Sequence, residues 1–188
     1  MKTKVTCLQT IINFRLLFLL FIIPILQGCP FNSPYKIDST PQNYVNEGLM
    51  GSWQGNVIDD YGVSRVVNMN LSKKSDNEYD VYFWGSFYKK KKKYTAVQDT
   101  IYGTAYISYV ANRQFMNIGV EGKYYITEFK YEQDEISLLP LAESFSSKII
   151  KSDEQLKSAI LMHYKTRLFP VYDESFCLRN MKRIKEPS

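Results

Sequence analysis

Short runs of aromatic and β-branched residues alternate with turn residues from Glu47 to the end of the chain. The runs recur at about 8 to 12 residues, which is typical of an all-β sandwich or barrel. They predict strands at residues 50–58, 63–71, 79–88, 94–100, 103–110, 113–119, 123–132 and 135–141. The turns between them include Asp59-Asp60-Tyr61-Gly62, Ser75-Asp76-Asn77-Glu78, Ala111-Asn112 and Glu121-Gly122, whose residues tolerate tight or left-handed backbone. The division at Tyr102-Gly103 stays open, because this stretch could also be one bent strand with Gly103 at a bulge.

One helix interrupts the strand pattern near the C-terminal end. Ser152-Asp153-Glu154-Gln155 matches a capping box, which marks a helix start. Leu156, Ile160 and Tyr164 follow at fourfold spacing and form one apolar stripe. We expect a last strand at residues 175–183 after this helix.

The strands carry large apolar residues on both faces. In the run from Tyr79 to Tyr88, one face holds Tyr79, Val81, Phe83 and Phe87, and the other holds Tyr82, Trp84 and Tyr88. An open sheet with one wet face would alternate more cleanly between apolar and polar residues. The pattern therefore favours a closed barrel, with one face inside and the other packing under the helix.

The order of elements resembles the lipocalin family, and Gly51-Ser52-Trp53 matches the Gly-x-Trp motif of its first strand. The resemblance implies an up-and-down antiparallel barrel of about eight to nine strands with one helix before the last strand. In that family the tryptophan closes one barrel end under an arginine from near the last strand. Arg179 or Arg183 would fill that place, and we assign Trp53 and Arg179 as the closing pair. The alternative is that Trp53 is an ordinary core aromatic.

The N-terminal region resembles a bacterial secretion signal. Lys2, Lys4 and Arg15 supply positive charge, and Leu16 to Leu26 is an unbroken apolar run of eleven residues. At about 1.5 Å per residue the run reaches roughly 16 Å, about half of a ~30 Å hydrocarbon core. It is too short to span comfortably, so a cleaved signal is favoured over a permanent transmembrane helix.

Leu26-Gln27-Gly28-Cys29 resembles a lipobox, the motif of bacterial lipoproteins. The resemblance implies cleavage before Cys29 and attachment of fatty acids to its sulfur. Stable anchoring takes more than one acyl chain, and the family's multiple chains would hold the protein at a membrane permanently. Pro30 follows the cysteine in place of the aspartate that retains such proteins in the inner membrane, so the resemblance favours the outer membrane, facing the periplasm. The alternative is that Cys29 simply lies beyond a signal anchor.

These observations divide the chain into four parts. Residues 1–28 are the signal, residues 29–46 are the acylated cysteine and a tether, residues 47–183 are the barrel, and residues 184–188 are a tail. Proline, asparagine, serine and threonine dominate residues 30–46. If flexible, these residues would have an end-to-end distance of roughly 23 Å, enough to lift the barrel clear of the headgroups.

Charge and cysteine content change once the signal is removed. Three of the 24 basic residues and none of the 19 acidic residues lie in the signal, which leaves a net charge of +2. Nucleic acid is therefore not an expected partner, because a phosphate-binding face needs a substantial basic excess. Cys7 is removed with the signal and Cys29 is acylated, so no internal disulfide can form. We expect the remaining Cys177 to be a small buried hydrophobic residue.

The most conspicuous local feature is a run of five lysines between aromatic residues. It comprises Lys89, Lys90, Lys91, Lys92 and Lys93. Like charges repel, which predicts a projecting hairpin tip that is solvated or contacts an acidic protein face or anionic headgroups.

Catalytic and cofactor motifs are scarce in the chain. The single histidine, His163, falls within the expected helix, where a packed or surface role is favoured over a general base. Neither a GxGxxG sequence nor a P-loop is present, so we expect no nucleotide cofactor. Asp76-Asn77-Glu78 is too short for a calcium loop, and we expect no metal.

Tyrosine is abundant, with 15 residues, and phenols suit either an amphiphile in a barrel cavity or a protein interface. We assign Tyr82, Trp84 and Tyr125 as ligand or partner contacts, together with the lysine run. The sequence thus predicts a lipid-anchored, non-catalytic binding protein for a small amphiphile or a polypeptide. The alternative is an immunity or inhibitor lipoprotein that blocks a toxic or hydrolytic partner, and a hydrolytic enzyme using His163 is a third hypothesis.

Overall fold

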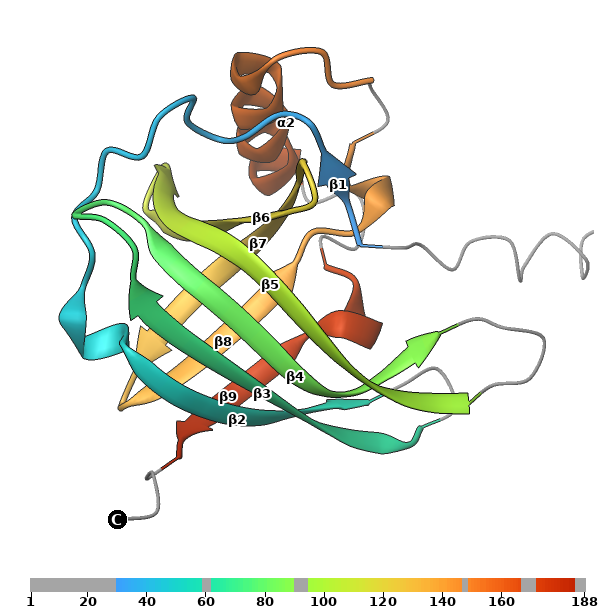
Figure 1. Ribbon diagram of the computed structural model, residues 1–188. Coiled ribbons are helices and arrows are strands. Elements are labelled where there is room, and N and C mark those ends of the chain that lie inside the picture. Colours follow the sequence, from blue (N-terminus) through green and yellow to red (C-terminus); the bar gives the residue numbers. More distant parts are fainter. Residues whose placement is uncertain (1–29, 59–61, 90–94, 147–148, 167–171, 185–188) are drawn as a thin grey trace, which may run out of the picture.

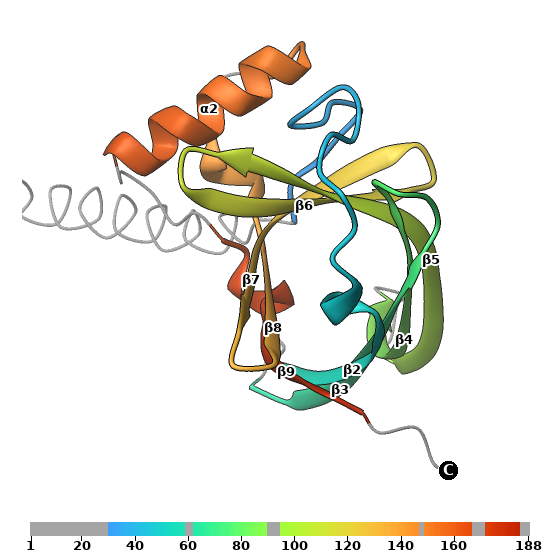
Figure 2. The ribbon, with the colours of Figure 1, turned by 90° about the vertical axis from the view of Figure 1, so that its left-hand side faces the viewer.

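The strands are joined by tight turns and wrap into a barrel (Figures 1 and 2). The structure is a computed structural model and describes residues 30–58, 62–89, 95–146, 149–166 and 172–184. For residues 86–89 and 95–99 it describes the backbone alone. Within these ranges, no helix has both the length and the apolar character needed to cross a bilayer.

Eight antiparallel strands close the barrel, and the mainly β architecture expected from the sequence is confirmed. In order around it, they are β2 (Gly51–Ile58), β3 (Ser64–Lys73), β4 (Tyr79–Lys89), β5 (Thr95–Val110), β6 (Arg113–Val120), β7 (Lys123–Glu132), β8 (Glu135–Pro140) and β9 (Leu178–Arg183). Each strand pairs with the next, and β9 pairs with both β8 and β2, which closes the ring. One short extra strand, β1 (Asn32–Ser33), pairs with the start of β7.

The turn residues explain why the hairpins form where the sequence predicts them. Ala111, Glu121, Gln133 and Asp134 have positive φ angles between 49° and 58°, and Gly122 has a φ of 78°. Two-residue turns with this left-handed backbone match the natural twist of paired strands. The hairpin registers β5–β6, β6–β7 and β7–β8 therefore follow from local chemistry.

The two strands expected at 94–100 and 103–110 are a single strand, β5, so the division at Gly103 is wrong. The pairing with β4 runs through Val81↔Gly103 and Tyr82↔Tyr102 without a shift. A Cβ at Gly103 would collide with the carbonyl oxygen of Gly119 on β6. Gly103 therefore marks a close approach of two backbones, and it does not mark a turn or a bulge.

The segment expected to be a flexible tether packs on the barrel, so the tether is wrong for residues 30–46. Ile37 is fully buried, and its N–H donates to Oδ1 of the buried Asn117 at 2.9 Å. Asn43 donates to the carbonyl of Ile107 at 2.9 Å, and Val45 N–H donates to Asp76 O at 2.8 Å. The segment crosses the barrel mouth and enters the short 3-10 helix η2 (Glu47–Leu49), seen on the left in Figure 1.

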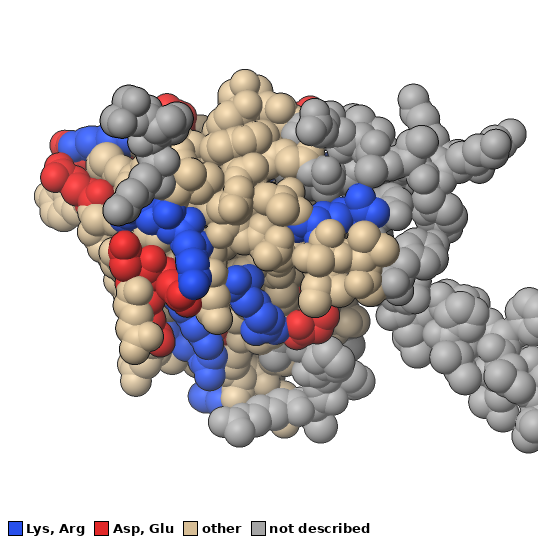
Figure 3. Space-filling model, turned by 90° about the horizontal axis from the view of Figure 1, so that it is seen from below, with Lys and Arg blue, Asp and Glu red and all other residues tan. Residues whose placement is uncertain are grey.

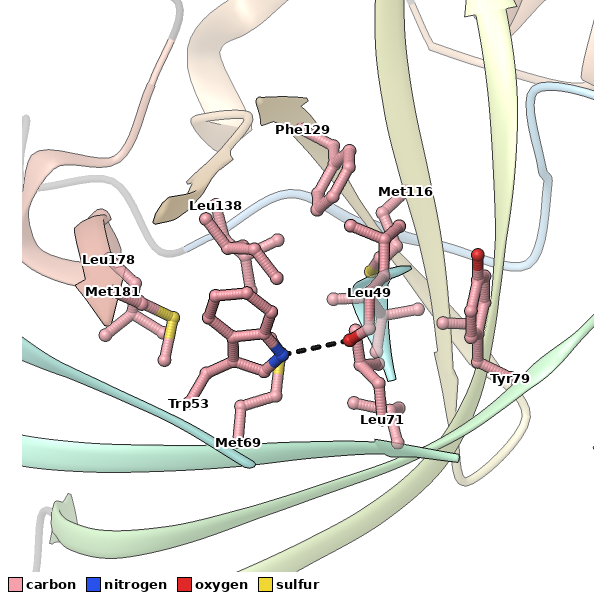
Figure 4. Packing of buried hydrophobic residues seen from close by; sticks show 14 of the residues in the cluster. Leu49, Trp53, Met69, Leu71, Tyr79, Met116, Phe129, Leu138, Leu178 and Met181 are labelled. Atoms are coloured by element: carbon pink, nitrogen blue, oxygen red, sulfur yellow. Dashed lines mark hydrogen bonds between the residues drawn. The ribbon is translucent and has the colours of Figure 1, made fainter. Parts of the chain in front are cut away.

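The barrel interior is occupied by one hydrophobic cluster (Figure 4). Sixteen buried residues form it: Leu49, Trp53, Val67, Met69, Leu71, Tyr79, Val81, Ala105, Ile107, Met116, Ile118, Phe129, Ile136, Leu138, Leu178 and Met181. Residues 30–46 and η2 together form the mouth-covering segment. Leu49 enters the interior from η2, and Trp53 from β2 is fully buried. Large side chains from the mouth and from the wall therefore meet inside, as in other small barrels whose interior is filled by side chains.

The helix α2 (Asp153–Thr166) lies against the outer face of the barrel (Figure 2). Its start is capped as the sequence predicts, because Ser152 Oγ accepts from the N–H of Gln155 at 3.2 Å. Leu156 and Ile160 pack with Phe115 and Ile126 of β6 and β7 in a second cluster. The expected last strand starts later than residue 175, because Asp173 caps a 3-10 helix, η4 (Glu174–Phe176), ahead of β9.

Candidate functional site

Three aromatic rings form a stacked row on the outside of the barrel, on β4 and β5. Tyr82 lies 4.9 Å from Trp84 and 4.6 Å from Tyr102, measured between ring centroids, with interplanar angles of 20° and 21°. Tyr82 and Tyr102 are direct cross-strand partners. Their hydrogen bond raises the pKa of the Tyr102 phenol. We call these three side chains the aromatic row.

The row faces away from the barrel interior, so a cavity-lining role is wrong for Tyr82 and Trp84. Side chains alternate along a strand, and Tyr79 and Val81 of β4 belong to the interior cluster. Tyr82 and Trp84 therefore lie on the opposite face, where Tyr102 is 70% exposed. The sequence identified aromatic residues on both faces of this strand but did not show which face was inside.

A band of uncharged polar side chains continues the aromatic row across β3 and β2. Asn68 and Asn70 are the cross-strand partners of Trp84 and Tyr82. Gln54 donates to Asn68 Oδ1 at 2.9 Å, and Asn70 donates to the hydroxyl of Ser52 at 3.0 Å. Hydrogen bonds thus hold the side chains beside the row in place, which presents an ordered surface of rings and amides.

Tyr125 lies in a different place from the aromatic row. It is partly buried and packs against the interior cluster, so the structure does not bring the three assigned aromatic contacts together. Its neighbours on β6 and β1 are Ile118 and Asn32.

Two pockets differ in size and lining. A pocket of about 130 Å³ lies beneath the mouth-covering segment. It is lined by Asn43, Tyr44, Asn46, Leu49, Tyr79, Ile107, Tyr109, Gln114, Phe129 and Tyr131. It falls below the roughly 300 Å³ at the lower end of pockets that hold small molecules. The second pocket, of about 420 Å³, is lined by charged and polar groups that include Lys130, Glu132, Glu135 and Arg179. These groups do not suit the apolar part of an amphiphile.

Trp53 lies beneath an arginine, and that arginine is Arg183. The Arg183 guanidinium carbon is 4.2 Å from the indole ring, and its two terminal nitrogens donate to the carbonyls of Met50 and Gly48. The indole N–H donates to Leu49 O at 2.9 Å. Arg179 instead forms an ion pair with Glu174 at 2.8 Å. The assignment of Arg179 is thus corrected to the alternative that the sequence left open, Arg183.

A buried carboxylate, which the sequence analysis missed, joins the helix to the barrel. Glu128 of β7 pairs with Arg113 at 2.8 Å and accepts hydrogen bonds from the hydroxyls of Tyr164 and Tyr172. The Arg113 guanidinium also lies 4.3 Å from the Tyr164 ring. Burial, together with the hydrogen bond to Glu128, raises the pKa of Tyr172 to about 12. The sequence does place Glu128 on the same strand face as the apolar Ile126, which could have indicated a buried carboxylate. Nothing in the sequence identifies the residues that pair with Glu128.

His163 and Cys177, the residues with catalytic potential, are both buried. His163 Nδ1 lies 2.9 Å from Phe145 O, so the ring is engaged in packing as the sequence analysis favoured. Burial raises the pKa of the Cys177 thiol to about 12, which disfavours the reactive thiolate. Nowhere in the described ranges do three or more His, Cys, Asp or Glu side chains gather in a group suited to a metal ion.

Two of the assigned features lie outside the described residues. These are the acylation site Cys29 and the lysines Lys90, Lys91, Lys92 and Lys93. Lys89 ends β4 and pairs through its backbone with Thr95 of β5. The described strands on either side of the lysine run in the sequence, β4 and β5, are therefore the two strands that carry the aromatic row.

Basic and acidic side chains are interspersed on the face seen from below (Figure 3). Two ion pairs on β9 illustrate this mixing, between Lys182 and Glu135 at 3.9 Å and between Arg183 and Asp134 at 3.5 Å. Among the described residues, this face therefore lacks the single-sign field that steers a highly charged ligand.

Comparison with known proteins adds no assignment. No protein-family model, curated protein or solved structure matches this chain.

Proposed function

We propose that the protein is an envelope lipoprotein, acylated at Cys29 and facing the periplasm from the outer membrane, that binds a polypeptide partner without catalysis. The lipobox-like sequence Leu26-Gln27-Gly28-Cys29 supports the anchoring. The observation that carries the binding function is the aromatic row on the outside of the barrel. Tyrosine and tryptophan are enriched in protein interfaces because they offer a large apolar area with a polar tip.

A polypeptide is favoured over a small amphiphile by the packing of the barrel. The amphiphile hypothesis needs an internal cavity, and the interior cluster occupies that space. The pocket of about 130 Å³ at the mouth has less than half the volume of typical small-molecule pockets. The ordered amides beside the row, such as Asn68 and Asn70, supply hydrogen-bonding groups that suit a peptide surface.

A binding role is favoured over hydrolysis by the surroundings of the two candidate groups. His163 is held inside the molecule by its contact with Phe145 O. Burial raises the pKa of the Cys177 thiol to about 12, which makes the nucleophilic thiolate still rarer at neutral pH. A general base or nucleophile needs access to substrate, which neither position offers.

The experiment is recovery of a partner from envelope extracts with the acylated protein and matched variants. We expect wild type and Tyr44→Ala to recover the same polypeptide, because Tyr44 is 81% exposed but lies outside the aromatic row. Trp84→Ala should lose most of that recovery, since aromatic residues at the centre of an interface often contribute about 2 kcal/mol or more. Equal recovery by Trp84→Ala and wild type would refute binding through the row.

The second candidate function is an immunity or inhibitor lipoprotein with an acidic partner. It is supported by the sequence position of the lysine run, which lies between β4 and β5, the two strands that carry the aromatic row. Replacing Lys89 to Lys93 by serine should slow association and reduce its dependence on salt. Association that is unchanged by both salt and substitution would exclude this electrostatic version.

A further inference from the structure

The first described residues are fixed to the barrel immediately after Cys29. Pro30 forms a β-bridge with Ala142, and Phe31 N–H donates to Leu141 O at 2.8 Å. The Phe31 ring packs edge-on against Phe145 with centroids 4.7 Å apart. These contacts set the position of residue 30 relative to the barrel wall.

The short linkage removes the freedom that a tether would give. Consecutive Cα atoms lie about 3.8 Å apart, so Cys29 is within that distance of a residue already bridged to the barrel. A flexible segment of residues 30–46 would have allowed roughly 23 Å of separation. Because those residues pack on the barrel, fatty acids on Cys29 would enter the bilayer directly beside the barrel wall.

The described chain starts at Pro30, on one side of the molecule. Figure 1 places the start of the described chain, the 3-10 helix η3 (Glu143–Phe145) and the segment leading into α2 on the right, and η2 and the β3–β4 turn on the left. Ile149, in the segment leading into α2, is 82% exposed, the largest exposed fraction among the large hydrophobic side chains of the described residues. Its neighbour Ile150 packs in the same cluster as Phe31.

We infer that the anchor-side surface, formed by Pro30–Asn32, η3 and Ile149, rests on the bilayer that holds the acyl chains of Cys29. The inference depends on the proposed acylation and adds a fixed orientation to it. Ile149 enters the headgroup region, where an apolar side chain is more stable than in water. η2 and the β3–β4 turn point away from the membrane towards the periplasm.

The test compares two serines at opposite ends of the molecule. Ser144 lies in η3 beside the anchor, and Ser75 lies in the β3–β4 turn. Each is changed to cysteine in the acylated protein, labelled with a fluorophore and reconstituted in vesicles of phosphatidylethanolamine and phosphatidylglycerol that carry nitroxide-labelled headgroups. Parent protein is the labelling control, since the buried Cys177 thiol should not react.

We expect the nitroxide lipids to quench the probe at Ser144 several-fold more strongly than the probe at Ser75. A variant with a 17-residue Gly/Ser spacer inserted between Cys29 and Pro30 should lose most of that difference. Equal quenching at the two positions in the parent would overturn the inference. An unchanged difference in the spacer variant would also overturn it, because the short linkage would then not set the orientation.

The mass of the N-terminal peptide separates this failure from failure of the proposed function. If Cys29 is acylated and the two probes are quenched equally, only the orientation is wrong. If the membrane-bound protein carries no acyl chain on Cys29, the proposed anchoring and the orientation fall together.

Discussion

The two faces of β4 carry the same kinds of side chain in different surroundings. On the inner face, Tyr79 is 1% exposed, and Phe83 packs against the interior cluster. On the outer face, Tyr82 stacks on Trp84 on one side and on the exposed Tyr102 on the other. The inner rings are therefore positioned to stabilise the barrel, whereas the outer rings retain surface that a partner can cover.

Trp53→Ala is the substitution expected to damage the interior most. The side chain is fully buried, its N–H is bonded to Leu49 O, and Arg183 lies over the ring. Removing such a side chain costs about 3 to 5 kcal/mol of the free energy of unfolding. Urea unfolding followed by circular dichroism measures this loss, and a loss below about 1 kcal/mol would contradict the packed interior.

Gly85→Ala tests the close approach of the β4 backbone to β3. Gly85 has a φ of 153°, and a Cβ there would lie 2.5 Å from the backbone carbonyl oxygen of Val66. We expect a loss of at least about 1 to 3 kcal/mol of stability from the strained conformation. Gly62→Ala is the matched control, because its φ of 76° is also strained for alanine but a Cβ there meets nothing within 4 Å, so this variant should lose less stability than Gly85→Ala. Similar losses in both variants would contradict the close approach of β4 to β3.

High pH should weaken the attachment of α2 to the barrel. Burial raises the pKa of Tyr172 to about 12 and also raises that of Tyr164, whereas an unfolded tyrosine titrates near 10. The unfolded chain therefore loses these protons first, so the stabilisation is complete below about pH 10 and declines between about pH 10 and pH 12.

Thermal unfolding at a series of alkaline pH values measures this decline. Tyr172→Phe should unfold with a shallower dependence on pH in the same range, because one raised phenol is gone. An identical dependence in wild type and variant would refute the contribution of Tyr172.

Trp84→Ala should change stability least. The stacked rings of the aromatic row contribute about 0.5 to 1.5 kcal/mol beyond their buried area. We expect a small shift of the urea midpoint alongside the large loss of partner recovery. A loss as large as that of Trp53→Ala would mean that the outer face is a second core.

The hairpins could be predicted because their turn residues are local in the sequence. The packing of residues 30–46 could not, because it depends on contacts with distant residues. The turns at Ala111-Asn112 and Glu121-Gly122 have their signal within a few residues, so the strands around them were located closely. Residues 30–46 contain few large apolar side chains, and they are held by partners such as Asn117, which is 80 positions from Ile37. Composition therefore indicated a tether where distant hydrogen bonds fix the chain.

The candidate site shows the same limit. Periodicity separated the two faces of β4 but could not show which face lay inside, because both carry aromatic rings. The choice between Arg179 and Arg183 depended on the register of β9, where Arg183 pairs with Trp53. Glu128 gave no signal of its partners, because Arg113, Tyr164 and Tyr172 come from separate elements.

Binding of the envelope polypeptide by two adjacent variants of β4 tests the central claim most directly. Phe83→Leu alters the inner face and Trp84→Ala the outer face. We predict that Trp84→Ala raises the dissociation constant by about tenfold or more, equivalent to about 1.4 kcal/mol, while folded Phe83→Leu binds like wild type. Unchanged binding by Trp84→Ala, or a larger loss in Phe83→Leu, would contradict the account that the outside of this barrel is its binding surface.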